Sequence, residues 1–271
     1  MNSPDREKSN SSTVHSVVVT VKLLEFLAHS GRPQRVTDIA ASLNMTKARV
    51  SRHLSTLTDL GLVARMPDSS GYRLGLTLFR LANAALDQYE ITNIAYRYMI
   101  LLRNEIDESL LLAIPAGGDA LIVSTIASSK TIGPNAPRGT RWTIPMSPTA
   151  RLVLAFSTET TRERVLARRS EPSSGVELAF EASDMRRTLE AIRRRFYEYD
   201  ANAHDAGFAT LSAPIFDHSE RLQAALTVVW PGRPDATGKD LRYIRQLRDT
   251  ALEISRTLGS TEMAGAMAAS V

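Results

Sequence analysis

The sequence has 271 residues, a formal net charge of +4 and no cysteine. This length allows two domains with separate cores. The absence of cysteine excludes disulfides, thiolate catalysis and cysteine-ligated zinc. No apolar run of about 20 residues could span a membrane, and the polar opening MNSPDREKSNSS lacks the apolar core of a secretory signal, so we expect a cytoplasmic protein.

The first structured element is expected after a disordered tail at residues 1–12. Leu23, Leu24, Phe26 and Leu27 then mark an amphipathic helix. The segment 37–61, TDIAASLNMTKARVSRHLSTLTDLG, predicts two further short helices joined by a tight turn.

The turn between these two helices has residues suited to their positions. Thr37 and Thr46 are expected to cap the two helices, because a threonine hydroxyl can accept a free backbone N–H. Asn44 tolerates the left-handed conformation that the turn needs. Gly61 should end the second helix, whose buried side is predicted from apolar residues at helical spacing: Val50, Leu54, Leu57 and Leu60.

The opposite side of the second helix is basic and carries small residues. At a helical rotation of about 100° per residue, Ala48, Arg52 and Ser55 lie opposite Val50. The short side chains of Ala48 and Ser55 allow the helix to approach a DNA groove closely. The alternative is an ordinary amphipathic helix with solvated charges.

A hairpin follows directly, with predicted strands Leu62–Arg65 and Tyr72–Leu74 around the turn-rich segment Pro67–Gly71. Three helices and a hairpin predict a winged helix-turn-helix domain over residues 13–75, with DNA as its partner. Residues 1–80 hold 11 Lys or Arg against 6 Asp or Glu, whereas residues 81–271 hold 22 against 23, so the basic excess lies in this domain. The candidate DNA contacts are Thr46, Lys47, Ala48, Arg49, Ser51, Arg52, His53, Arg65 and Arg73.

The remaining chain predicts a linker and an α+β domain with a largely antiparallel sheet. A linker helix, or two consecutive helices, is expected over residues 76–92, the second domain over 93–259 and a tail over 260–271. Gly117, Gly118 and Asp119 indicate a hairpin turn. Further elements are expected as helices at 149–156, 160–169, 184–197 and 239–258, with a break at 172–175, and as strands at 207–216 and 222–230.

Over Val14–Gly259 the chain resembles the IclR family of transcriptional regulators. The resemblance lies in SVVVTVKLLEFLA, MTKARVSRHLSTLTDLG and GYRLG in the first domain, and in IPMSPTARLVLAF, GFATLSAPIFD and EISRTLG in the second. It implies a GAF-like second domain that binds a small organic effector, often a carboxylate or aromatic metabolite, and a homodimer or homotetramer on palindromic double-stranded operator DNA. Val18, Val19 and Ala150 depart from the residues common in the family, and the Gly-Lys pair of many members is missing from the helix at 149–156.

Matching the family's pocket segments implies effector contacts at Met146 and Ser147 in a loop, Asp200 at the end of the arginine-rich helix, Phe208 and Thr210 on one strand, and Thr227 on the next. The alternatives are that Phe208 is core, Thr227 a satisfied buried hydroxyl and Asp200 a surface charge. The cations nearest the loop, which could pair with a ligand carboxylate or be solvated, are Arg138, Arg141 and Arg151.

No catalytic residues, metal ligands or cofactor motif are predicted. The five histidines show no ligand spacing, His204 beside Asp205 included, and no nucleophile elbow accompanies them. The expected function is therefore a sequence-specific, effector-controlled transcriptional regulator. Two alternatives stay open: a catalytic GAF-like domain tethered to a DNA-binding module, and a MarR-like regulator, which would be shorter and largely helical after the wing.

Overall fold

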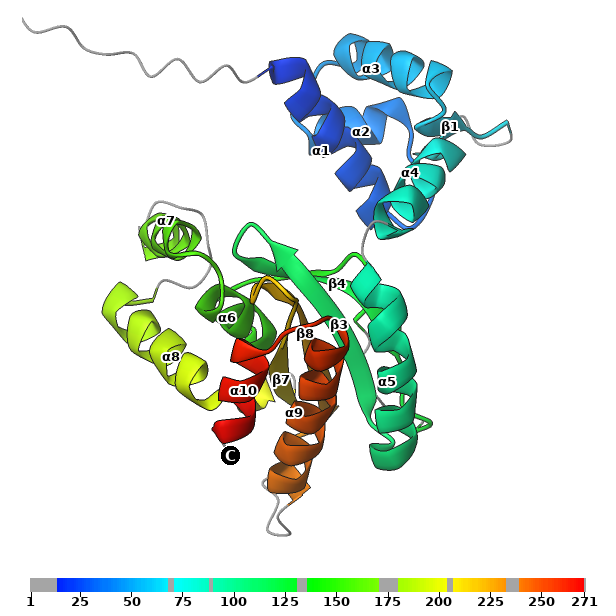
Figure 1. Cartoon of the computed structure of the whole chain (residues 1–271). Coiled ribbons are helices and arrows are strands. Elements are labelled where there is room, and N and C mark those ends of the chain that lie inside the picture. The colour runs from blue at the N-terminus through cyan, green and yellow to red at the C-terminus, as the bar shows by residue number, and fades with distance from the viewer. Residues whose placement is uncertain are drawn as a thin grey trace, which may run out of the picture. The chain divides into compact units, whose positions relative to one another are not determined.

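The computed structural model divides the chain into two compact units, residues 1–88 and 89–271, which are described separately. It describes residues 14–67, 71–87, 90–130, 136–170, 180–203, 207–232 and 239–270 (Figure 1). The expected tail at 1–12, the wing tip at 68–70, the break at 172–175 and the pair His204 and Asp205 lie outside these residues.

The first unit is a winged helix-turn-helix domain, as the sequence predicted. Its elements are α1 (His15–His29), α2 (Val36–Ser42), α3 (Lys47–Asp59), β1 (Val63–Arg65), β2 (Tyr72–Leu74) and α4 (Leu76–Asp87). The strands β1 and β2 pair in antiparallel fashion, and the backbone of Tyr72 also pairs with that of Gln34, which fixes the wing against the loop between α1 and α2. The core is closed by apolar side chains of the first three helices and the wing: Val19, Leu23, Leu27, Ile39, Ala40, Val50, Leu54, Leu57 and Val63.

The turn between α2 and α3 forms largely as expected. Asn44 has a φ of 51°, and the Thr46 hydroxyl accepts the backbone N–H of Arg49 at 3.3 Å. The prediction for Thr37 was wrong: α2 begins at Val36, so Arg35 holds the N-cap position and the Thr37 hydroxyl instead bonds Asp38. The prediction that Leu60 is buried was also wrong, since Leu60 follows the end of α3 and is 59% exposed.

The second unit is an antiparallel sheet between two helical layers. Its elements are α5 (Glu90–Ile106), β3 (Ser109–Ala116), β4 (Asp119–Ile126), β5 (Arg141–Trp142), α6 (Pro148–Ala155), α7 (Glu159–Ser170), α8 (Ala182–Arg195), β6 (Glu198–Ala203), β7 (Phe208–Phe216), β8 (Leu222–Pro231), α9 (Lys239–Thr257) and α10 (Glu262–Ala269). The strand order is β5-β4-β3-β8-β7-β6, and each described neighbouring pair is antiparallel.

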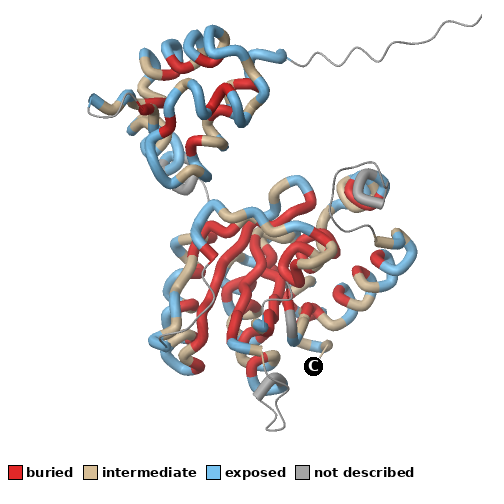
Figure 2. The backbone as a smooth tube through the Cα atoms, turned by 180° about the vertical axis from the view of Figure 1, so that it is seen from behind, coloured by how far each residue is buried: buried red, intermediate tan, exposed pale blue. Residues whose placement is uncertain are grey.

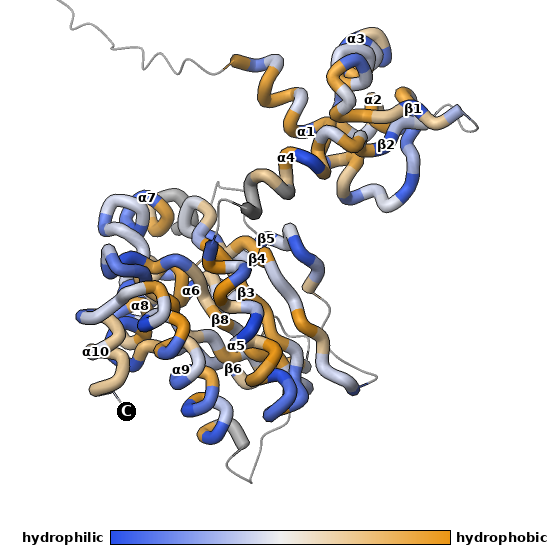
Figure 3. Tube along the Cα trace, turned by 45° about the vertical axis from the view of Figure 1, so that its right-hand side comes forward, coloured by the Kyte–Doolittle hydropathy of each residue, from blue (hydrophilic) through white to orange (hydrophobic). Residues whose placement is uncertain are grey.

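The strands at the centre of the sheet are buried on both faces, because helices cover both. Val229 belongs to a buried cluster with α6, whereas the next residue, Trp230, contacts Tyr243 of α9 with ring centroids 5.2 Å apart. Buried residues accordingly concentrate along the strands (Figure 2), and apolar residues run along β3 and β8 (Figure 3). The hairpin turn at Gly117 and Gly118 forms as predicted, with both residues at positive φ.

The arginine-rich helix ends earlier than predicted. Phe196 takes a left-handed φ of 57° and closes α8, and its ring lies 5.5 Å from that of Phe156. The chain then reverses into β6, which was not predicted and which pairs with β7. Asp200 therefore lies on a strand opposite Thr210 and not at a helix end, which corrects the sequence-based placement.

The segment 76–92, expected as a linker of one helix or of two consecutive helices, contains α4 and the start of α5, so the second alternative is confirmed. The tail expected at 260–271 is wrong for most of its length, because residues 262–269 form α10 with Ala264 and Met267 buried.

Candidate functional site

The outer face of α3 is the candidate DNA-reading surface. Val50, Leu54 and Leu57 are buried, so the opposite residues must face solvent. The exposed ones are Lys47, Ala48, Ser51, Arg52 and Ser55, together with Thr46 at the cap, while Arg49 is half-buried. An exposed arginine flanked by short side chains can enter a major groove without a steric barrier.

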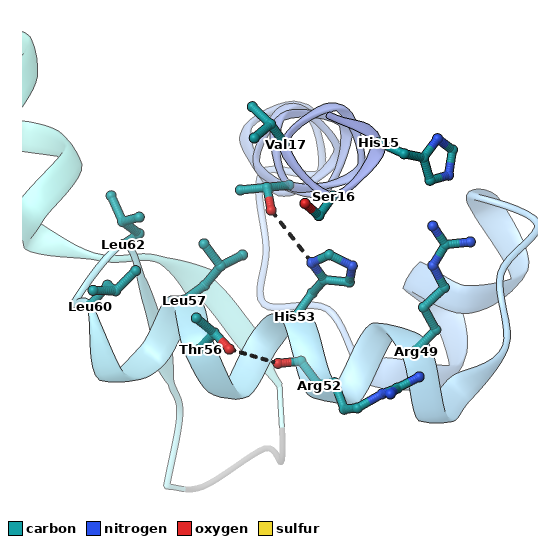
Figure 4. A pocket seen from close by; sticks show the side chains of 11 residues that line it. His15, Ser16, Val17, Arg49, Arg52, His53, Thr56, Leu57, Leu60 and Leu62 are labelled. Carbon is teal, nitrogen blue, oxygen red and sulfur yellow. Dashed lines mark hydrogen bonds between the residues drawn. The ribbon is translucent and has the colours of Figure 1, made fainter. Parts of the chain in front are cut away.

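His53 differs from its neighbours because it faces α1. Its Nδ1 lies 3.4 Å from the Thr20 hydroxyl, in a groove of about 710 Å³ between α1 and α3 (Figure 4). Partial burial, followed by the charges of Arg49 and Arg52, lowers the pKa of His53 from its ordinary value of 6.5. The neutral imidazole is thus favoured, and the geometry gives His53 a contact with α1.

The wing presents its two arginines on opposite faces. Arg73 is paired in register with Ala64, whereas Arg65 is paired with Tyr72, and side chains of successive strand residues alternate. Tyr72 packs toward the domain core, so Arg73 is on the outward face and Arg65 is on the other, exposed at the strand end.

Three buried hydroxyls meet between α6 and the sheet of the second unit. Thr149 of α6 lies 2.9 Å from Ser212 of β7 and 3.2 Å from Thr227 of β8, and Ser212 lies 2.9 Å from Thr227. All three residues are 0% exposed. Sequence reasoning selected Thr227 but missed Thr149 and Ser212, although Ser212 shares a strand face with the selected Thr210.

The other residues expected around an effector lie on the same side of the sheet. Ser147 is buried and caps α6 by accepting the N–H of Ala150 at 3.2 Å, with Met146 half-buried beside it. Phe208 is partly buried against the apolar cluster on the α6 side, and Thr210 is buried. The fold therefore brings the expected loop and strand residues to one side of the sheet.

Arg151 is engaged by protein groups. Its guanidinium donates to Glu198 at 2.8 Å, to the Pro145 carbonyl at 2.6 Å and to Asp200 at 3.4 Å. Burial lowers the pKa of Arg151, and the Asp200 charge opposes this shift. Two carboxylates thus neutralise the cation that sequence reasoning offered to a ligand.

The other two cations offered to a ligand lie apart from this cluster. Arg141 of β5 forms an ion pair at 3.1 Å with Asp119, the first residue of β4. Arg138 is exposed. In the described part of the chain, no group of three or more His, Asp or Glu side chains could hold a metal ion. No helix among those residues is long and apolar enough to cross a membrane.

A winged helix-turn-helix unit followed by an antiparallel-sheet unit defines a class of two-domain transcriptional regulators. The profile of the C-terminal domain of bacterial IclR transcriptional regulators matches residues 83–256, and that of the IclR helix-turn-helix domain matches residues 16–67. The chain therefore belongs to the IclR family. It is a transcriptional regulator with a DNA-binding helix-turn-helix domain, and the curated proteins that it matches are named as transcriptional regulators or repressors rather than enzymes.

Individual relatives cover nearly the whole chain. The HTH-type transcriptional regulator KipR of Bacillus subtilis (strain 168) is 26% identical over 250 residues, which are 91% of this chain and 98% of KipR. The solved IclR transcriptional regulator of Alicyclobacillus acidocaldarius has a TM-score of 0.74 and 20% identity, covering 92% of this chain and 100% of its own. An IclR homologue of Microbacterium hydrocarbonoxydans, solved in complex with 4-hydroxybenzoate, has a TM-score of 0.72 and 21% identity, covering 91% and 100%.

Proposed function

We propose that this regulator binds a specific operator in double-stranded DNA and is controlled by a small organic effector, a carboxylate or aromatic metabolite. DNA recognition is assigned to the outer face of α3, with Arg52 at its centre, and to the wing. The observation that carries this assignment is the exposed basic face of α3 opposite a fully buried apolar face. Exposed arginine is suited to bidentate contact with guanine or to pairing with phosphate.

The test of operator binding is selection of duplexes from a random library, followed by fluorescence anisotropy over a range of salt concentrations. A specific regulator enriches a shared palindromic motif and prefers it over a scrambled duplex at physiological salt. Equal and steeply salt-dependent binding to both duplexes would mean that α3 supplies only electrostatic attraction.

The effector is proposed to bind on the α6 side of the sheet, where apolar surface and buried hydroxyls lie together. The hydroxyls of Thr149, Ser212 and Thr227, which bond one another in the structure, can donate hydrogen bonds to a polar ligand group or accept them from it. Phe208 offers an apolar contact. The 4-hydroxybenzoate complex of the Microbacterium homologue supports an aromatic ligand with a polar substituent. Contacts are further proposed from the neighbouring loop and strand residues Met146, Ser147, Arg151, Asp200 and Thr210.

A panel of carboxylates and phenols, starting with 4-hydroxybenzoate, tests this assignment by its effect on the melting temperature. A true effector raises the melting temperature, changes operator affinity and is recovered unconsumed. Thr227→Val should reduce the response, whereas Thr188→Val should not, because the Thr188 hydroxyl bonds its own helix at Asp184. Turnover of the ligand would favour the catalytic alternative.

A homodimer or homotetramer is also proposed, because two α3 helices are needed to bind two half-sites of a palindrome. Exposed apolar side chains on α4 support this assembly: Leu76 is 86% and Phe79 is 68% exposed, and they lie three residues apart on one helix face. Contact with a second copy would remove this surface from water.

A further inference from the structure

Helix α10 lies beyond residue 256, where the family profile ends, and its N-terminus is held by a residue from another element. Glu220, in the turn between β7 and β8, accepts the backbone N–H groups of Thr261, Glu262 and Met263 at 2.8, 3.0 and 3.1 Å. The Ser260 hydroxyl donates to the same carboxylate at 2.6 Å. Glu220 therefore satisfies three free amides at the start of α10, while the Ser260 hydroxyl accepts the N–H of Ala264, and the carboxylate places a negative charge at the positive end of the helix dipole.

The C-terminus of α10 is held by the opposite charge. Arg248 of α9 is only 8% exposed, and its Nη2 donates to the Met267 carbonyl and to the Ser270 hydroxyl, both at 2.7 Å. A buried guanidinium is costly unless its donors are satisfied. The docked end of α10 supplies acceptors for Arg248, and Arg248 in turn complements the negative end of the helix.

Arg248 also contacts the residues that lead into β6. Its guanidinium carbon lies 5.9 Å from the ring centroid of Tyr197, and that of Arg195 lies 5.1 Å from the same ring. Arg195 donates to the Tyr197 carbonyl at 2.7 Å and forms an ion pair with Glu198. The ring of Tyr197 thus has two guanidinium groups within 6 Å at the point where α8 gives way to β6.

The same chain of contacts reaches the loop that precedes α6. Glu198 accepts from Arg151, and Arg151 donates to the carbonyl of Pro145, next to Met146 and Ser147. Buried ionic groups that share partners respond together when one partner is removed, because the low dielectric leaves the others poorly compensated.

We propose that Arg248 is a positioning residue for the loop at 145–147. Docking of α10 holds Arg248 against Tyr197. The contacts of Arg195, Glu198 and Arg151 then connect Tyr197 to the loop, so that the docked helix restrains the loop's motion. The description of that loop as part of the effector site rests on the proposed function. The restraint itself does not, since it can be measured without any ligand.

Hydrogen exchange of the full-length protein tests the restraint. Arg248→Met should speed exchange about tenfold, equivalent to about 1.4 kcal/mol, in α10, in 197–203 and in 143–151. In the same variant, exchange in strand β3 should not change. The control variant Arg245→Met, which replaces an exposed arginine of the same helix, should exchange like the unaltered protein in all of these segments. Arg248→Lys keeps the charge near Met267 but loses the planar guanidinium beside Tyr197, so it should restore protection of α10 and leave the loop exchanging faster.

Faster exchange confined to α10 would overturn the proposal, because the helix would then be held without any effect on the loop. A uniform rise that includes β3 would also overturn it, since this is general destabilisation. Glu220→Gln provides the second route if Arg248→Met does not fold: it weakens the exposed N-terminal attachment of α10 and should produce the same pattern in the loop. All these measurements are made without effector, so a failed effector screen leaves their result unchanged.

Discussion

Replacement of Arg52 by alanine is the most direct test of how this regulator recognises DNA. Arg52 is exposed on α3, so its loss removes no core packing, and the free energy of unfolding should change by no more than about 0.5 kcal/mol. A bidentate contact with a base contributes roughly 1–3 kcal/mol of discrimination, which corresponds to a roughly 5- to 150-fold weaker affinity for the selected operator.

Two outcomes of this experiment separate the possible roles of Arg52. If Arg52 contacts a base, affinity for the operator falls and affinity for scrambled DNA changes little. If it contacts a phosphate, binding to both duplexes weakens and the dependence of log K on log salt loses about one unit of slope. Fluorescence anisotropy at several salt concentrations measures both quantities.

The matched control is Arg32→Ala, which removes the same charge from the exposed loop between α1 and α2. It should lower affinity only through long-range electrostatics, equally for operator and scrambled DNA. Equal effects of Arg52→Ala and Arg32→Ala on operator affinity would refute the assignment of α3 as the reading surface.

Three further predictions concern the rest of the molecule. Thr227→Val should cost about 1 kcal/mol in chemical denaturation, because the Thr149–Ser212 hydrogen bond at 2.9 Å remains; a cost near zero would mean that the lost hydroxyl is not stabilising. Phe79→Asp should weaken self-association about tenfold or more, as measured by sedimentation equilibrium, because burial of an exposed phenylalanine contributes roughly 1.5–3 kcal/mol. An unchanged mass distribution would place the contact between copies elsewhere. The pKa of Glu220 is lowered from 4.5 to about 2, first by the Ser260 hydroxyl and then by the backbone N–H of Thr261, so its stabilising effect is complete above pH 4.5 and is lost as pH falls toward 2. Acid titration of Glu220→Gln should lack this component of the stability loss, and identical acid profiles of the two proteins would contradict the attachment.

The sequence by itself determined the elements whose signals are local. Thr46 capping α3, Asn44 in the turn before it, and Gly117 and Gly118 in the hairpin each act on residues a few positions away. Their conformations follow from backbone sterics and from hydrogen bonds within one turn, so the winged domain and the strand pair were predictable from short stretches of sequence.

The tertiary structure alone decided which residues meet on the α6 side of the sheet. Thr149 meets Thr227 across 78 positions of sequence, and Arg151 meets Glu198 across 47. Nothing near Arg151 in the sequence shows that two carboxylates will neutralise it, and the missed strand β6 arises because the buried Phe196 reverses the chain after α8.

Helix α10 likewise depends on contacts between residues that are distant in the sequence. Locally, only the Ser260 hydroxyl caps its first turn among the described residues, by accepting the N–H of Ala264 at 3.3 Å. The acceptor of the other N-terminal amides, Glu220, stands about 40 positions earlier in the turn between β7 and β8. An eight-residue helix is unstable alone, so it forms because the sheet and α9 bring an acidic group to one end and an arginine to the other.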